Sequence, residues 1–290
     1  MLMPPDRPRQ RSSLARSVGA GSASRDGPSW VAIVGASLLL ILLLGGGVWA
    51  YVLSRQSHVP VDMASLCPTD RPPSEVTVLL LDASDRLDEP QLLAIKNHLA
   101  RLQSNLPKFA LLEAYVVEGR GEQFARPLMH LCNPGDGRDM SSIYENPALA
   151  AKRWKSEFSD RISAELEPLL TQPHSPASPI FEAVQAISLR TFSKPEFDQV
   201  AKRLILFSDL LQNMPGQQSH YRQIPDFSEF RKTPYFDRVR ANLGDVQIDV
   251  FYLARTGSDT QGIDHVRFWE QYFAAQGATV RSVERIYGDR

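Results

Sequence analysis

The chain has 290 residues, a formal net charge of −1 at pH 7 and 43% hydrophobic residues. The near balance of basic and acidic residues argues against a partner such as nucleic acid, which proteins bind through an excess of positive charge. The length allows one or two domains, and the apolar content is adequate for a packed core.

The first two segments differ sharply in composition. Residues 1–29 are rich in Pro, Ser, Gly and Arg, which predicts a disordered tail. Residues 30–53 form an uncharged, mostly apolar segment, which as a helix reaches about 36 Å and exceeds a hydrocarbon core of about 30 Å. We expect one transmembrane helix here, because a cleaved secretory signal has an apolar region of only about 7–15 residues.

The arginines around this segment predict its orientation. Five precede it (Arg7, Arg9, Arg11, Arg16 and Arg25), whereas only Arg55 closely follows it. Positive residues stay on the cytoplasmic side of a membrane. We therefore expect a cytoplasmic amino terminus and an exported remainder, which is periplasmic if the cell is a Gram-negative bacterium. Residues 54–74, with four prolines, are expected to form a semi-rigid linker.

Strand and helix patterns alternate along residues 75–290. The continuous apolar run Val76–Leu81 is typical of a central parallel strand that is buried on both faces. Five more strands are predicted at Phe109–Val117, Pro127–Cys132, Leu204–Ser208, Val246–Leu253 and Thr279–Ile286. Helices are predicted at Glu89–Leu102, Pro147–Leu170, Ile180–Phe192 and Asp264–Gln276. Residues 227–243 are predicted to be largely helical, with an interruption near Pro234. This order predicts one α/β domain, doubly wound, with a mostly parallel six-stranded sheet and helices on both faces.

Two smaller features are predicted in the second half of the domain. Asp264 and Gly277 are expected to cap the last helix at its two ends. Residues 210–226 are expected to form a long polar loop in which His220 is solvated. The histidines show no spacing typical of a zinc site.

Polar side chains follow two of the predicted parallel strands. Asp82 and Ser84 come after the first, Asp209 comes after the fourth, and Ser178 precedes a predicted helix. The carboxyl ends of parallel strands meet at one edge, where open α/β sheets bind their ligands. Carboxylate and hydroxyl oxygens are the ligands that Mg²⁺ prefers. Each residue also has a purely local interpretation, as the cap of a turn or of a helix.

This order of motifs resembles the von Willebrand factor A (vWA) family over roughly residues 72–287. The resemblance implies a metal-ion-dependent adhesion site in which Asp82, Ser84, Ser178 and Asp209 hold Mg²⁺, with Mn²⁺ and Ca²⁺ also open, and a partner carboxylate completes the shell. Arg86 stands where the family has a second serine, and its permanent charge opposes a divalent cation. Pairing of Arg86 with Asp85 or Asp88 would point it away from the ion. A metal-free site, in which the guanidinium of Arg86 can replace the cation, is the alternative.

The resemblance also implies where the two cysteines lie. In the vWA arrangement the third strand runs antiparallel to its neighbours, so that Cys132 at its end and Cys67 before the first strand lie opposite the predicted site. An exported pair is in an oxidising compartment, and we expect a disulfide between Cys67 and Cys132. Two separate buried thiols are the alternative.

The expected function is therefore that of a membrane-tethered, exported vWA-like domain that binds another protein of the cell envelope. Two alternatives remain open: a metal-free scaffold of an envelope complex, and a metal-assisted hydrolase. We expect no enzyme, because the sequence has no Gly-rich phosphate loop and no nucleophile elbow. A phosphatase of the haloacid dehalogenase type would need a second Asp where Ser84 stands.

Overall fold

The computed structural model describes residues 30–56, 59–117, 119, 124–140, 146–171 and 177–288. The chain divides into two compact units, Met1–His58 and Val59–Arg290. In the first unit, α1 (Trp30–Gln56) carries exposed apolar side chains. The side chains at 32, 50 and 52–56 of α1 lie outside the described residues, as does the predicted disordered tail. Within the part of the chain that the structure describes, no helix is both long and apolar enough to cross a membrane.

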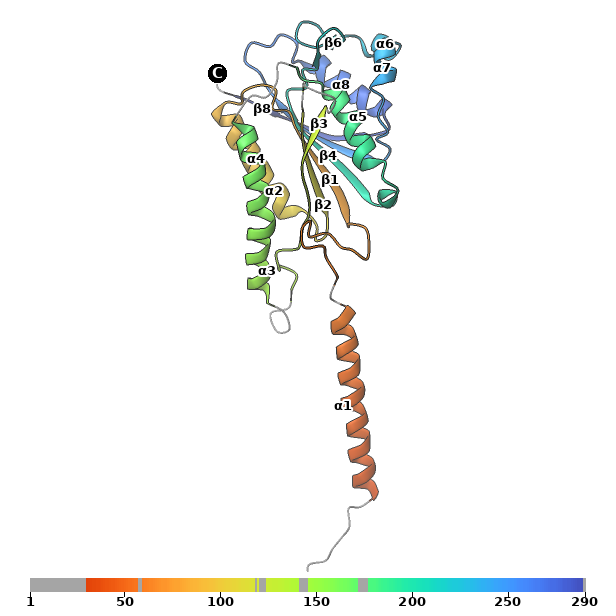
Figure 1. The fold of residues 1–290 in the computed structure, drawn as a ribbon. Helices are drawn as coiled ribbons and strands as arrows, with labels where there is room; N and C mark the ends of the chain where they lie inside the picture. Colours follow the sequence, from red (N-terminus) through yellow and green to blue (C-terminus); the bar gives the residue numbers. More distant parts are fainter. Residues whose placement is uncertain are drawn as a thin grey trace, which may run out of the picture. The chain divides into compact units, whose positions relative to one another are not determined.

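The second unit is built on a six-stranded sheet in the order β3-β2-β1-β4-β7-β8 (Figure 1). Its strands are β1 (Glu75–Leu81), β2 (Leu111–Val117), β3 (Ala125–Cys132), β4 (Ala201–Ser208), β7 (Val246–Leu253) and β8 (Thr279–Ile286). β3 is antiparallel to β2, and the other neighbours are parallel. The predicted fold class is confirmed.

Helices cover both faces of this sheet (Figure 1). One face carries α2 (Glu89–Asn105), α3 (Pro147–Arg153) and α4 (Asp160–Leu170), and the other carries α5 (Ile180–Ile187) and α8 (Ile263–Ala275). Side chains of β1 alternate between the two cores: Val78 and Leu80 enter the core with α5, whereas Leu79 and Leu81 enter the core with α2. A strand buried on both faces needs a continuous apolar run, which is the pattern that the sequence has.

Two predicted helices contain a wider turn. The helix predicted over residues 147–170 has the π-helical segment Trp154–Ser159 between α3 and α4. The helix predicted over residues 180–192 ends in a second π-helical segment, Ser188–Phe192.

The helix predicted over residues 227–243 is interrupted before Pro234 as expected, but residues 239–243 are not helical. Only two short helices form, α6 (Phe227–Phe230) and α7 (Pro234–Arg238). The side chain of Thr233 accepts a hydrogen bond from the N–H of Phe236 and starts α7, with Pro234 as its first residue. Proline suits that position because it has no N–H to donate to the preceding turn.

The ends of α8 are partly as predicted. Gly262 occupies the N-cap position, so the expectation for Asp264 is wrong; Asp264 lies in the first turn, where it pairs with Arg267. Gly277 follows the last turn with φ +91°, the left-handed conformation in which glycine ends a helix.

The predicted polar loop 210–226 is also partly wrong. It contains the small hairpin of β5 (Asn213–Met214) and β6 (Gln218–Ser219), and His220 is fully buried rather than solvated. The N–H of His220 donates to the carbonyl of Gln212, which is buried as well.

The compact unit begins earlier than the expected boundary at residue 75. Residues from Val59 onward belong to it, with a β-bridge between Val61 and Pro68 and with Leu66 in the core. Cys67 and Cys132 form the predicted disulfide, with a Cα–Cα distance of 4.8 Å. Cys132 pairs with Leu111 at the start of β2, so the disulfide lies at the end of the sheet opposite the carboxyl ends of the parallel strands.

Candidate functional site

The structure brings Asp82 and Asp209 to one crevice at the carboxyl edge of the sheet. β1 and β4 are neighbours in register, with Leu81 opposite Phe207, and each aspartate comes just after the paired residues. Both side chains are buried, at 8% and 5% exposure. The predicted convergence of the two carboxylates is therefore present.

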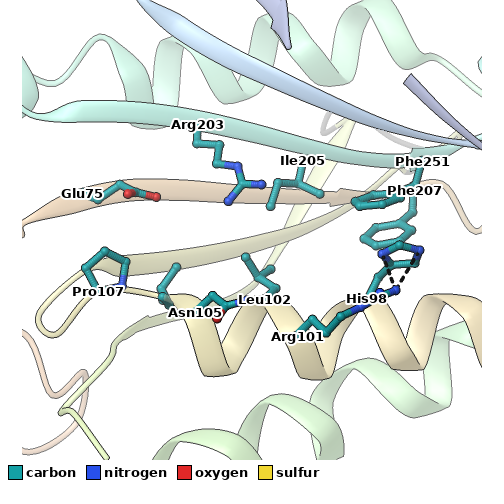
Figure 2. Close-up of a pocket in the computed structure, with 11 residues that line it drawn as sticks. Glu75, His98, Arg101, Leu102, Asn105, Pro107, Arg203, Ile205, Phe207 and Phe251 are labelled. Atoms are coloured by element: carbon teal, nitrogen blue, oxygen red, sulfur yellow. Dashed lines mark hydrogen bonds between the residues drawn. The ribbon is translucent and has the colours of Figure 1, made fainter. Parts of the chain in front are cut away.

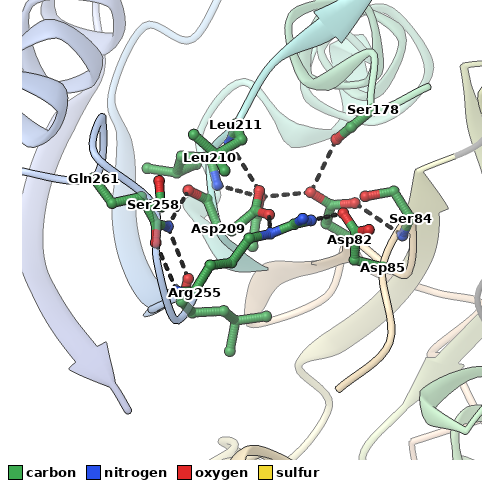
Figure 3. A network of polar contacts seen from close by, with 12 residues as sticks. Asp82, Ser84, Asp85, Ser178, Asp209, Leu210, Leu211, Arg255, Ser258 and Gln261 are labelled. Carbon is green, nitrogen blue, oxygen red and sulfur yellow. Dashed lines mark hydrogen bonds and ion pairs between the residues drawn. The ribbon is translucent and has the colours of Figure 1, made fainter. Parts of the chain in front are cut away.

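Asp82 is held by three donors from three separate segments (Figure 3). One carboxylate oxygen accepts hydrogen bonds from the hydroxyls of Ser178 (3.0 Å) and Ser208 (2.8 Å). The other accepts from the N–H of Ser84 (3.2 Å). Ser84 and Ser178 thus lie beside Asp82 as predicted, but the Ser178 hydroxyl donates to the carboxylate, and Ser178 does not cap α5, whose N-cap is Pro179.

Asp209 is paired with Arg255, which follows β7. The guanidinium of Arg255 contacts the Asp209 carboxylate and also that of Asp85 (Figure 3). Burial, and then the neighbouring Asp82, raise the pKa of Asp209 well above its usual value. Taken alone, the ion pair with Arg255 lowers the pKa of Asp209, because a nearby positive charge favours the ionised carboxylate.

The side chain of Gln261 holds the loop after β7 in place by hydrogen bonds. Its amide donates to the carbonyls of Asp209 and Leu253, each at 2.9 Å, and its oxygen accepts from the N–H of Arg255 at 2.7 Å. One buried side chain therefore joins the ends of β4 and β7 and sets the backbone position of Arg255.

The turn after Asp209 is strained. Leu210 has φ +57° and is buried, a backbone conformation that costs free energy for a bulky residue. In this turn the N–H of Leu210 donates to the Ser208 hydroxyl and that of Leu211 donates to the Asp209 carboxylate, each at 2.8 Å. The strained turn thus directs two backbone donors at the crevice.

Arg86 does not replace a cation within the crevice. Its side chain is exposed at the rim, and Asp85 pairs with Arg255 instead. Asp88 accepts a hydrogen bond from the N–H of Gln91 and caps α2. Among the described residues Asp85 pairs with Arg255 and not with Arg86, so the expected pairing of Arg86 with Asp85 is not found.

Ser208 and Arg255 were not among the residues predicted for this site. A signal existed for Ser208, which directly precedes Asp209 at the end of β4. For Arg255 the signal was its place after the predicted strand Val246–Leu253, whose carboxyl end meets the same edge.

The crevice does not fit a divalent cation in this arrangement. Its cavity is about 30 Å³, room for about two water molecules, whereas Mg²⁺ keeps several waters in an octahedral shell. The positive charge of Arg255 already lies against Asp209. In the described ranges, no group of three or more His, Cys, Asp or Glu side chains is arranged to hold a metal ion.

A larger cavity of about 240 Å³ lies between α2 and the sheet (Figure 2). Its floor includes the stacked rings of Phe207 and Phe251, with centroids 4.5 Å apart. The ring of His98 lies 4.1 Å from that of Phe251, and its Nε2 lies 3.1 Å from a carboxylate oxygen of Glu284. None of the predicted site residues lines this cavity.

Comparison with known proteins adds little to this geometry. No protein-family model and no curated protein matches the chain. The chain is similar to the solved VWA domain of SpRpn10 (11% identity, 74% of this chain and 89% of that chain, TM-score 0.38). It is also similar to the conserved hypothetical protein BatB from Bacteroides thetaiotaomicron (14% identity, 74% and 91%, TM-score 0.35). A third similar structure is a von Willebrand factor type A protein from Catenulispora acidiphila (14%, 71% and 42%, TM-score 0.34). Likeness at this level carries no argument about function.

Proposed function

We propose that the chain is a membrane-tethered, exported vWA-like domain that binds another protein of the cell envelope through the carboxyl edge of its sheet. The observation that carries this proposal is the charged network of Asp82, Asp209 and Arg255, which the ends of β1, β4 and β7 bring together. Open α/β sheets bind their ligands at this edge.

Exposed residues on the segments that form or adjoin the crevice are of types common at interfaces. Tyr221 is 39% exposed, and its ring centroid lies 5.8 Å from the guanidinium carbon of Arg255. Ile263, two residues after Gln261, is 75% exposed, and Arg86, which lines the crevice, is exposed as well. Aromatic and arginine side chains are enriched at protein interfaces.

The tether in this proposal rests on the sequence of residues 30–53, which contains no charged residue. The five arginines before it and Arg55 after it favour an exported domain by the positive-inside rule.

We propose a non-enzymatic role for the crevice. A hydrolase would need a general base near the reacting groups. Asp82 already accepts three hydrogen bonds, and Asp209 is paired with Arg255. Both carboxylates thus already have protein partners in the crevice.

Site-specific photo-crosslinking in intact cells tests the binding edge. A photoreactive amino acid at Ile263 or Tyr221 of the full chain should give discrete protein adducts. Met63 is the matched control, since it is 74% exposed but lies in the segment beside the disulfide at the other end. Adducts from Met63 alone, or from none of the three positions, would contradict binding at this edge.

A further inference from the structure

We infer that Arg255 occupies the cation position of the crevice, so that the chain carries its own positive charge where the vWA resemblance implies a divalent ion. This inference deepens the proposed function, and it rests on that function in one respect: the crevice edge is taken as the binding surface. Its consequence is that the edge keeps its shape without Mg²⁺ or Ca²⁺.

Three carboxylates create the need for a positive charge. Asp82, Asp85 and Asp209 all line the small cavity, together with Arg255. Negative charges that share one small cavity repel one another, so each makes the ionised form of the others less stable. The Arg255 guanidinium contacts two of the three carboxylates and lies within electrostatic reach of Asp82.

Arg255 is well suited to this role. A guanidinium is permanently charged and presents its donors in a fixed fork that can contact two carboxylates at once. Its side chain is 28% exposed, and its backbone is held by Gln261. A tethered cation of this kind cannot dissociate, unlike a metal ion.

The other polar groups of the crevice direct their hydrogen-bond donors at the two carboxylates of Asp82 and Asp209. The hydroxyls of Ser178 and Ser208 donate to Asp82, and the N–H of Leu211 donates to Asp209. These donors, together with Arg255, satisfy the two carboxylates with no ion between them.

Removing the positive charge of Arg255 should convert the crevice into a metal site. Arg255→Gln leaves the carboxylates without their cation but keeps side-chain hydrogen-bond donors. A divalent ion then relieves their repulsion, and a ligand that binds only the folded state stabilises it by mass action.

The experiment follows thermal unfolding of the full chain, purified in detergent, in EDTA and in millimolar MgCl₂ or MnCl₂. The melting temperature of the wild type should not respond to either ion. That of Arg255→Gln should be lower in EDTA and should rise by about 4–8 °C at an ion concentration roughly thirtyfold above the dissociation constant. Calorimetry should detect ion binding to this variant and none to the wild type.

Two controls separate charge from general damage. Arg255→Lys keeps a positive charge and should stay indifferent to both ions. Arg285→Gln removes an arginine that donates to the carbonyl of Gln261, and any loss of stability there should not be restored by Mg²⁺. If Arg255→Gln is not recovered folded, the double variant Arg255→Gln with Asp85→Asn, whose net crevice charge equals that of the wild type, carries the same test.

The inference is overturned by a wild-type melting temperature that rises with Mg²⁺ or Mn²⁺, or by an Arg255→Gln variant that both ions leave unchanged. These outcomes are independent of the crosslinking result. Absence of adducts at Ile263 and Tyr221 removes the proposed binding edge, whereas it leaves the assignment of the cation position standing.

Discussion

His220 is a titratable residue enclosed by aromatic rings. Its imidazole is fully buried, with ring centroids 4.9 Å from Phe268 and 5.5 Å from His265. Neither ring nitrogen has a hydrogen-bond partner among the described residues. Burial, and then the neighbouring His265, lower the pKa of His220 to about 3.

This burial predicts a loss of stability in mild acid. The unfolded chain takes up a proton at His220 below about pH 6.5, whereas the folded chain does so only near pH 3. The contribution of His220 is thus fully present above pH 6.5, and it falls by up to about 1.4 kcal/mol per pH unit as the pH drops towards 3. His220→Phe should remove the part of this fall that His220 causes, whereas the part from His265, whose burial lowers its pKa to about 4, should remain. The variant should also raise the free energy of unfolding by about 1–3 kcal/mol at neutral pH, because the two unpaired ring nitrogens of His220 are then no longer buried.

Denaturant unfolding of the full chain at pH 7.5 and at pH 5 measures both effects. The same substitution at His130, whose side chain is 49% exposed, should leave the fall between the two pH values in place. An equal fall in His220→Phe and in the wild type would show that His220 is not the group responsible.

The segment that leads into β1 is an element of the domain in its own right. The Cys67–Cys132 disulfide joins it to β3, and the N–H of Cys132 donates to the carbonyl of Ser65 at 2.8 Å. The two cysteines are 65 residues apart. In the chain-entropy account a cross-link over this length stabilises the fold by about 4 kcal/mol.

Replacing both cysteines by serine should therefore lower the free energy of unfolding by about 4 kcal/mol. The disulfide lies opposite the crevice, so the response of Arg255→Gln to Mg²⁺ should survive in the cysteine-free background. Unfolding in denaturant measures the loss, and peptide mapping without reductant identifies the bond. Two free thiols in protein isolated from its native compartment would contradict the cross-link.

For the whole molecule, the central prediction is its orientation across a membrane. An alkaline phosphatase fused after Arg290 should be active, because this reporter folds only outside the cytoplasm, and a green fluorescent protein fused there should be dark. The physical reason is the excess of arginine before residue 30. Replacing the five arginines before residue 30 with serine should weaken the preference. Fluorescence from the wild-type fusion, with no phosphatase activity, would reverse the assigned orientation.

The sequence by itself determined the six strands, the two-sided burial of β1 and the convergence of Asp82 and Asp209. These follow from local patterns. A continuous apolar run indicates a strand that is buried on both faces, and a residue just after a parallel strand lies at the carboxyl edge of the sheet. Only the tertiary structure decided which cation lies between the carboxylates. A lone arginine after a strand has no local signature, and Arg255 meets Asp209 and Asp85 only because β7 packs beside β4 and β4 beside β1. The burial of His220 was decided in the same way, because a polar loop is buried only when aromatic side chains from distant helices close over it.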